Sequence, residues 1–362
     1  MSSNRLNIAF VIDDLGFGGA QRQLSILAAA LARTDVPVVF CLSQTTHPFA
    51  GHMMDAGVEV VVLPRSHGFD LKRLGLLARA FDKRGIDVVH GFLDAANVYA
   101  YAAARRSRRP CVLSLRNERL RLRGIRAWLL ERALRRADHV VTNSLAGVRF
   151  LVDRTAVPPD RVTLIPNAVS PGLEPPTDPP AERLSPVIGF VGRLTAQKQV
   201  GLLLDAFALV IRELPDARLV IVGDGPDREQ LTGQVRRLGV DNAVEFTGHV
   251  DDPEHWMARF SCLALPSAYE GFPNVAMEAI ALGVPVVAAA AGDVEDIVLD
   301  GRTGYVAREL SPQGLAELLT RTVTDESLRL RAYEEGPALV RANYSVETSV
   351  KKLRAVYAAA IR

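Results

Sequence analysis

Two glutamates and a helix start stand at spacings that suit a ligand carrying phosphate. Glu270 and Glu278 lie eight positions apart, and a helix is expected to begin between them because Pro273 fits a first helical position and Gly283 a stop. With a rise of about 1.5 Å per residue, Glu278 lies roughly 7 Å beyond that start, so the two acids should meet different parts of one ligand. The free backbone N–H groups near this helix start, around residues 272–274, attract an anion, typically phosphate.

A second loop supplies two cations. Arg193 and Lys198 follow an apolar run and precede a helical pattern, so one strand-to-helix loop carries both. Arginine offers a planar fork to phosphate oxygens and lysine a mobile point charge, so the pair could neutralise a diphosphate leaving group without a metal. The alternative interpretation is ordinary surface charge.

Two glycine-rich turns could form further walls of a phosphate pocket. The turn at Asp14 to Gln21 contains Gly18 and Gly19, and another lies at Gly223 to Pro226. Glycines allow a close approach of backbone to ligand, but a tight strand-to-helix connection explains them equally well. Neither turn has a clean Gly-x-Gly-x-x-Gly pattern, so a nicotinamide site is not favoured.

Several polar residues follow predicted strands. His90 ends one strand beside Gly91, so its imidazole is expected to project out of the core. The sequence favours a functional role and a structural role for this histidine equally. Arg116, Asn143 and Asn167 end others and face a ligand or, for the asparagines, cap a helix or turn. No histidine has a partner at zinc-site spacing and no Asp-x-Asp pair follows a strand, so no metal and no cofactor are expected.

The composition predicts a two-domain enzyme-sized protein rather than a nucleic-acid binder. The chain has 362 residues, 48% of them hydrophobic, and a net charge of +2. Its three cysteines lie in apolar runs and indicate reduced thiols in a cytoplasmic protein. No secretory signal is visible, and the apolar runs are far shorter than the roughly 20 residues that span a bilayer, so any membrane contact should be peripheral.

One segment departs from this neutral balance. Residues Arg105 to Arg136 hold twelve arginines against two glutamates, with Leu120, Ile125 and Trp128 among them. Such a surface could dock on anionic lipid head groups at the inner face of the cell membrane. A solvated arginine-rich helix is the equally weighted alternative, and nucleic acid is not expected because no recognised binding module accompanies the segment.

Buried strands and amphipathic helices alternate twice along the chain, which predicts an α/β protein with two doubly wound, Rossmann-like domains. We expect a first domain at residues 1–170, a proline-rich linker at 171–186 and a second domain at 187–345. Ligands of such sheets bind outside the carboxyl ends of the strands, and between domains they bind in the cleft. Predicted strands of the first domain are Asn7 to Ile12, Val36 to Leu42, Val58 to Leu63, Val88 to His90, Cys111 to Leu115, His139 to Thr142 and Val162 to Ile165. Those of the second are Val187 to Val191, Arg218 to Val222, Val244 to Phe246, Cys262 to Leu265 and Pro285 to Ala289.

The order and spacing of these motifs resemble glycosyltransferase family 4, whose members are retaining enzymes with the two-domain GT-B fold and a deep interdomain cleft. The likeness covers almost the whole chain. It rests on Gly192-Arg193-Leu194 with Lys198, Val222 to Pro226, Phe246-Thr247-Gly248, Glu270-Gly271-Phe272-Pro273 with Glu278, Gly18-Gly19-Ala20, Thr142-Asn143-Ser144, Ile165-Pro166-Asn167 and Gly283 to Ala288.

The resemblance implies a role for each motif. Arg193 and Lys198 would hold the donor diphosphate, Glu270 with the backbone of Gly271, Phe272, Pro273 and Asn274 the transferred sugar and phosphate, and Glu278 the ribose hydroxyls. The base would lie near Gly223 and Val250, with Gly18 and Gly19 also on the donor. His90 would act on the acceptor side, although relatives often carry a second histidine where this chain has Phe92. A last helix at about 346–362 would return to the first domain.

The sequence therefore predicts a retaining, metal-independent transferase that moves a sugar from a nucleoside diphosphate sugar, preferably a UDP-sugar, to a hydroxyl. The acceptor would be a glycan, polysaccharide or lipid-linked intermediate. A nucleotide-sugar epimerase of the same architecture is the main alternative. A glycosidase fits the paired acids but leaves the cations unexplained, and a lipid-binding module explains the arginines but leaves Glu270 and Glu278 unused.

Overall fold

The computed structural model describes residues 5–16, 18–43, 46, 49–63, 70–116, 123–177 and 186–362, in two compact units. The first unit comprises Met1–Ala168 and Tyr344–Arg362, and the second Val169–Asn343. The chain thus leaves the first unit at residue 168 and returns to it at 344, close to the predicted positions 170 and 345. Of the predicted linker, residues 171–177 belong to the second unit, and 178–185 lie outside the described residues.

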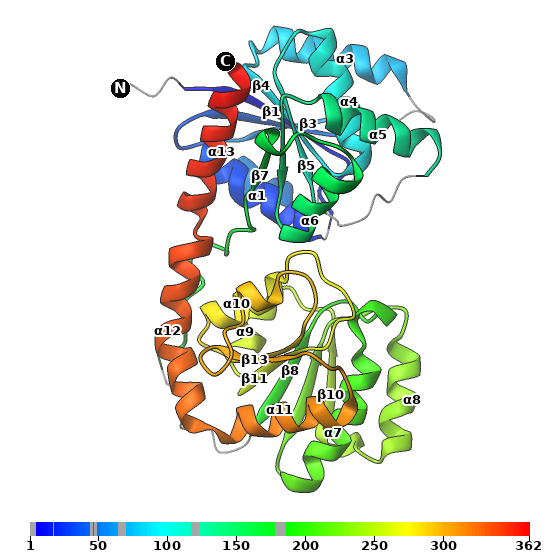
Figure 1. The fold of residues 1–362 in the computed structure, drawn as a ribbon, viewed down its shortest axis with the longest axis vertical. Helices are drawn as coiled ribbons and strands as arrows, with labels where there is room; N and C mark the ends of the chain where they lie inside the picture. The colour runs from blue at the N-terminus through cyan, green and yellow to red at the C-terminus, as the bar shows by residue number, and fades with distance from the viewer. Residues whose placement is uncertain are drawn as a thin grey trace. The chain divides into compact units, whose positions relative to one another are not determined.

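The first unit is built on a seven-stranded parallel sheet (Figure 1). Its strand order is β3-β2-β1-β4-β5-β6-β7, so the chain starts in the middle and builds outward in both directions, as a doubly wound fold requires. The strands are β1 (Asn7–Ile12), β2 (Val36–Cys41), β3 (Glu59–Val62), β4 (Val88–Phe92), β5 (Cys111–Leu115), β6 (His139–Thr142) and β7 (Val162–Leu164).

Helices cover both faces of this sheet, which explains why β1, β4, β5 and β6 are runs of buried residues. One core lies under α3 (Leu71–Lys83), α4 (Asp94–Arg106) and α5 (Ile125–Arg136). The other lies under α1 (Gly19–Leu31) and α13 (Val346–Ile361), and includes Leu24, Leu353 and Tyr357. The remaining α-helices are α2 (Phe49–Asp55) and α6 (Leu145–Arg149).

The second unit repeats the design with six parallel strands in the order β10-β9-β8-β11-β12-β13. These are β8 (Val187–Val191), β9 (Arg218–Val222), β10 (Val244–Gly248), β11 (Cys262–Leu265), β12 (Val286–Ala289) and β13 (Gly304–Ala307). Its helices are α7 (Val200–Glu213), α8 (Arg228–Leu238), α9 (Pro253–Met257), α10 (Asn274–Ala281), α11 (Pro312–Thr324) and α12 (Glu326–Tyr344). Helices α7 and α11 pack on one another and on a core that includes Phe190, Phe207 and Leu315.

The prediction of two Rossmann-like α/β domains is confirmed, and each predicted strand is present within a residue or two. Strand β13 was not predicted, because it begins at Gly304 directly after a polar turn and so lacks the apolar run that marks the other short strands. None of the described helices is both long and apolar enough to cross a membrane.

Candidate functional site

The candidate site of the second unit lies at the carboxyl edge of its sheet. Strand β8 is flanked by β9 and β11, and all three run parallel, so the loops that follow them emerge side by side. The loop after β8 carries Arg193 and Lys198, the loop after β9 carries Gly223, and the loop after β11 carries Glu270. The fold therefore brings together motifs that are far apart in the sequence.

The loops after β8 and β9 interlock through their backbones. Leu194 N donates to Asp224 O at 3.0 Å, and Gly192 N donates to Val222 O at 3.0 Å. A Cβ on Gly223 would come within 2.1 Å of Gly192 O, so only glycine fits there. The second glycine-rich turn thus has a packing role whether or not it contacts a ligand.

The loops after β8 and β11 are joined by an ion pair. Lys198 Nζ lies 2.5 Å from Glu270 Oε1, and both side chains are mostly buried, with 19% and 10% exposed. Gln197 fixes the same junction, since its Nε2 donates to Tyr269 O at 2.8 Å and its carbonyl accepts from Ala268 N at 2.9 Å. The sequence predicts contacts of Lys198 and Glu270 with different parts of a ligand, and the structure brings the two side chains into direct contact.

Arg193 lies in the same loop but is exposed. Among the described residues no carboxylate pairs with its guanidinium, whereas Lys198 is held by Glu270. The loop therefore carries one cation that is paired with a carboxylate, Lys198, and one that is paired with none among the described residues, Arg193. An uncommitted guanidinium beside a buried ion pair is suited to an anionic ligand.

The predicted helix start is present one residue later than expected. Helix α10 begins at Asn274, with Pro273 as its N-cap and no side-chain cap. Glu278 lies within this helix and is 4% exposed, while Glu270 precedes it and is 8% exposed. Both acids are thus held in place rather than free at the surface.

A fourth loop, after β12, closes against the acidic one. Gly292 has φ +62°, and a Cβ there would lie 2.2 Å from Glu270 O. Asp293 follows it and is buried. Sequence reasoning missed Gly292 and Gln197 as positioning residues, because their contacts depend on which strands are neighbours.

Val250 was predicted to lie near the base of the donor. It follows β10 by two residues and is half-buried. Gly223 N donates to Gly248 O at 2.8 Å, which ties the loop after β9 to the end of β10. Gly223 and Val250 therefore belong to one connected stretch of the carboxyl edge.

In the first unit, Gly18 and Gly19 are exposed at the start of α1, with Gly18 as the N-cap residue. Asp14 shapes this turn, because its Oδ1 accepts from Gly16 N at 3.0 Å and from Gln21 Nε2 at 3.0 Å. A contact of Gly18 and Gly19 with the donor stays a prediction.

The expectation for His90 is wrong. Strand β4 continues to Phe92, so His90 lies in mid-strand and is 0% exposed. Its Nδ1 lies 2.7 Å from Tyr357 Oη and its Nε2 lies 2.8 Å from Ser114 Oγ, so both ring nitrogens are occupied. Burial, and then the nearby Arg116, lowers the pKa of His90 well below its usual value. The imidazole is a neutral core residue that joins α13 to the sheet.

Within the described residues, no cluster of three His, Cys, Asp or Glu side chains could hold a metal ion. A metal-free site stays a prediction, because that finding concerns clusters within the protein alone.

Comparison with known families decides the relationship. The family model described as "Glycosyltransferase Family 4" matches residues 17–173, and the family model described as "Glycosyl transferases group 1" matches residues 185–325. The chain belongs to glycosyltransferase family 4. Both matches together include the loops that carry Gly18, Arg193, Lys198, Glu270 and Glu278.

Individual family members give the same result. A D-inositol 3-phosphate glycosyltransferase of Nocardioides is 30% identical over 290 residues, 74% of this chain and 60% of the relative. A lipopolysaccharide core biosynthesis glycosyltransferase, LpsE of Rhizobium meliloti, is 31% identical over 170 residues, 47% of this chain and 48% of the relative. The matches thus span less than two thirds of these curated relatives.

The fold matches a solved glycosyltransferase along nearly its whole length. The crystal structure of Anabaena HepE in complex with UDP-glucose superposes with a TM-score of 0.85 at 22% identity, covering 98% of this chain and 100% of HepE. At that identity the likeness shows the fold, which is that of the GT-B members of the family. These glycosyltransferase relatives give the epimerase alternative no support.

Proposed function

We propose that the protein transfers a sugar from a nucleoside diphosphate sugar to a hydroxyl acceptor, with retention of the anomeric configuration and without a metal. The observation that carries this proposal is the loop junction of the second unit, where Arg193 and the Lys198–Glu270 pair lie beside the start of α10. The bond from the anomeric carbon to the diphosphate breaks, the diphosphate leaves with the electron pair, and the acceptor oxygen forms the new bond. The acceptor proton passes to a diphosphate oxygen on the same face.

The charges suit this reaction because the departing diphosphate must be stabilised. Arg193 can grip one phosphate with its fork, and a backbone N–H group in the first turn of α10, such as that of Val275, can donate to another oxygen. An ammonium has three donors, so Lys198 can hold Glu270 and still donate to phosphate. In return Glu270 Oε2, which has no hydrogen-bond partner among the described residues, can accept from a sugar hydroxyl.

A UDP-sugar is our proposed donor, and Glu278 and the stretch from Gly223 to Val250 its nucleoside contacts. The HepE structures in complex with UDP and with UDP-glucose support this choice. A glycan, a polysaccharide or a lipid-linked intermediate is the proposed acceptor, and the names of the relatives are compatible with such hydroxyl acceptors. Such donors place the reaction in the cytoplasm.

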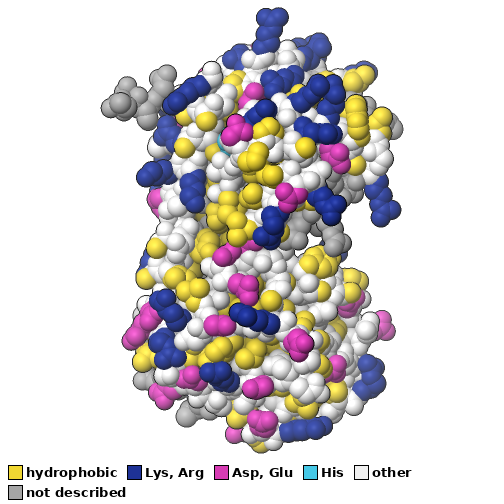
Figure 2. Space-filling model, in the orientation of Figure 1, with side chains coloured by type: hydrophobic (Ala, Val, Ile, Leu, Met, Phe, Trp, Pro, Cys, Tyr) yellow, Lys and Arg dark blue, Asp and Glu magenta, His cyan; other side chains and the backbone are white. Residues whose placement is uncertain are grey.

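We also propose peripheral contact with an anionic membrane through α5. Ile125 and Trp128 on this helix are 73% and 51% exposed, and Arg126, Arg132 and Arg135 lie on the same helix. Figure 2 shows Lys and Arg side chains spread over much of the first unit. Exposed apolar side chains flanked by cations suit a headgroup surface. Residues 117–122 of the predicted basic segment, with Arg119 and Arg121, lie outside the described residues.

The transfer proposal is tested by melting the protein with a panel of nucleoside diphosphates and sugar nucleotides. A ligand at 100 times its Kd stabilises the folded state by about 2.7 kcal/mol, so the preferred donor is expected to raise Tm clearly. Incubation of that donor without acceptor separates transfer from epimerisation, because an epimerase would release the epimer. No response to any sugar nucleotide would contradict the proposal.

The membrane proposal is tested by sedimentation with vesicles rich in phosphatidylserine at low salt. Trp128→Ala is expected to reduce binding, and the exposed Leu71→Ala on α3 serves as the matched control. Equal sedimentation of both variants with the wild type would argue against α5 as the contact.

A further inference from the structure

A second polar cluster lies at the carboxyl edge of the first unit's sheet. Arg116 directly follows β5, Asn143 directly follows β6, and Asn167 lies three residues beyond β7. These strands are neighbours in the order β5-β6-β7, so the three side chains emerge together. Arg116 Nη1 donates to Asn167 Oδ1 at 2.7 Å, and Asn143 Nδ2 donates to the same oxygen at 3.4 Å.

The guanidinium of Arg116 has no counter-charge in the described residues. Among the described residues it donates a hydrogen bond to Asn167 and lies over the ring of Phe92, whose centroid lies 4.9 Å from its Cζ. Burial lowers the pKa of Arg116 to about 10, opposed only by Tyr357. Buried charges in proteins are normally paired, so an unpaired guanidinium calls for a ligand.

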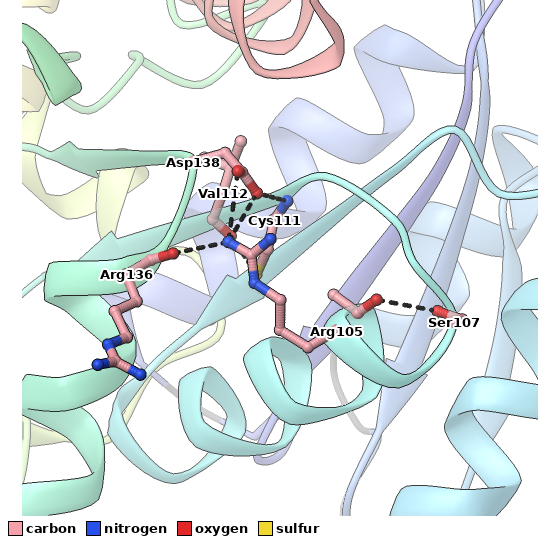
Figure 3. Close-up of polar contacts among 7 residues, drawn as sticks. Arg105, Ser107, Cys111, Val112, Arg136 and Asp138 are labelled. Atoms are coloured by element: carbon pink, nitrogen blue, oxygen red, sulfur yellow. Dashed lines mark hydrogen bonds and ion pairs between the residues drawn. The ribbon is translucent and has the colours of Figure 1, made fainter.

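Arg105, in the same unit, has the hydrogen bonds and the ion pair expected of an arginine with a purely structural role. Its Nη2 donates to Arg136 O at 2.7 Å and lies 3.3 Å from both oxygens of Asp138, which also accepts from Cys111 N (Figure 3). Arg105 therefore has a carboxylate that is itself fixed to the backbone. Arg116 has one neutral amide, that of Asn167, and an aromatic ring in place of that carboxylate.

The unsatisfied atoms around Arg116 indicate the chemistry of the missing group. Nε and Nη2 form one edge of the guanidinium, and neither makes a hydrogen bond to a described residue. This edge is the fork that grips two oxygens of a phosphate or carboxylate. Asn143 Oδ1 also lacks a partner and is an acceptor, so it suits a hydroxyl donor. Nε and Asn143 Oδ1 are buried, whereas Arg116 as a residue is partly exposed.

We infer that the acceptor is anionic: a phosphate or carboxylate group of a polyhydroxylated acceptor binds the Nε/Nη2 edge of Arg116, and one of its hydroxyls donates to Asn143. Calling this ligand the acceptor rests on the proposed glycosyl transfer. The anion site itself stands on the geometry of the first unit.

Calorimetric titration with inorganic phosphate and with acetate tests the anion site. Each is titrated into wild type, Arg116→Gln, Arg116→Lys and the control Arg79→Gln, which removes an exposed arginine of α3. The difference between wild type and Arg116→Gln defines binding at Arg116, so anion bound at the Arg193 loop cancels. We expect Arg116→Gln to weaken anion binding at least tenfold, Arg116→Lys to weaken it less, and Arg79→Gln to leave it unchanged.

Equal affinities of wild type and Arg116→Gln for both anions would overturn the inference. Melting curves separate a purely structural role: that role predicts a lower Tm for Arg116→Gln in anion-free buffer, whereas the anion site predicts no loss there and a larger phosphate-dependent rise of Tm in wild type than in the variant. Tighter binding of phosphate than of acetate would identify the anionic group of the ligand as a phosphate ester. Tighter binding of acetate would identify it as a carboxylate.

An activity comparison distinguishes this inference from the proposed function. With a sugar nucleotide present, wild type is expected to glycosylate phosphate-bearing or carboxylate-bearing polyols faster than their neutral counterparts, and Arg116→Gln to lose that preference. Arg116-dependent anion binding without any glycosylation would remove the proposed function and leave the anion site. Glycosylation that favours neutral acceptors in both proteins would remove the inference and leave the function.

Discussion

Lys198 and Glu270 impose the strongest local requirement of the second unit, because two mostly buried charges depend on each other. Removing one partner leaves the other charge buried and unpaired, which is more costly than losing both. Arg193 and Gly225 differ from this pair: Arg193 is exposed, and Gly225 is packed so closely against the backbone of Leu194 that a Cβ would not fit. Substitutions at these positions should therefore fail in distinguishable ways.

Lys198→Ala is expected to lower kcat about 100-fold, equivalent to about 3 kcal/mol of transition-state stabilisation, because the diphosphate loses a cation. It should also lower Tm, because Glu270 is left unpaired. Steady-state kinetics and melting curves check both effects against Lys351→Ala, an exposed lysine of α13. Wild-type kcat in a folded Lys198→Ala variant would contradict the assigned role.

Gly225→Ala is expected to displace the loop after β8, because a Cβ there would lie 2.2 Å from Leu194 O. Backbone cannot yield as a flexible side chain can, so we expect a lower Tm and at least tenfold weaker donor binding. Gly233→Ala on α8 is the matched control: its nearest neighbour would be Arg237 Nη1 at 3.5 Å, and alanine favours a helix by about 1 kcal/mol. Similar melting and binding of the two variants would refute this account of the turn.

The carboxyl group of Asp13 should make the stability of the folded protein depend on pH. Burial, with Asp14 and Asp94 nearby, raises its pKa from 3.8 to about 6. The folded protein therefore holds this proton more tightly than the unfolded chain, so stability from this group is fully present below pH 4 and is lost as pH rises through 6. Asp13→Asn is expected to raise the free energy of unfolding by about 1 to 2 kcal/mol at pH 8, and by less at pH 5. Urea titrations at the two pH values check this, and a gain that grows toward acid would oppose it.

At the scale of elements, α13 is part of the first unit's core. Leu353, Val356 and Tyr357 pack among residues of β1, β4 and α1, and Tyr357 reaches His90 in mid-strand. The hydrogen-bonded chain from Tyr357 through His90 to Ser114 joins α13, β4 and β5. The C-terminal helix is thus a structural requirement of the first unit.

Tyr357→Phe is expected to cost about 1 kcal/mol, because His90 Nδ1 loses its only hydroxyl partner while the ring still fills the core. Tyr305→Phe in the second unit is the control, since its hydroxyl makes no hydrogen bond to a described residue. Chemical denaturation measures both variants. An equal, negligible cost for the two would show that the Tyr357–His90 contact is not a stabilising one.

For the whole molecule, the sequence was enough to predict the architecture and the loops at the carboxyl edge of the second sheet, whereas donor binding by Arg193, Lys198 and Glu270 stays a prediction. Alternating buried and amphipathic segments predicted both sheets, and the spacing around Glu270 predicted α10 within one residue. The Lys198–Glu270 contact was out of reach, because it joins positions 72 residues apart and depends on β8 lying next to β11. The expectation that His90 ends its strand fails for a local reason. A glycine such as Gly91 often marks the end of a strand, but here it lies within β4. A Cβ at Gly91 would meet Asn97 Oδ1 at 2.5 Å, so the glycine is required for packing within the strand.

Transfer of a sugar, with Arg193 as the exposed cation that grips the diphosphate, is the central claim. Its most direct test is the simultaneous measurement of nucleoside diphosphate release and glycosylated product, with the donor that raises Tm most, in wild type and Arg193→Ala. We predict one product per diphosphate released in wild type, and a rate about 100-fold lower in a folded Arg193→Ala protein. Diphosphate release without a glycosylated product, or a near-normal rate in Arg193→Ala, would contradict the account.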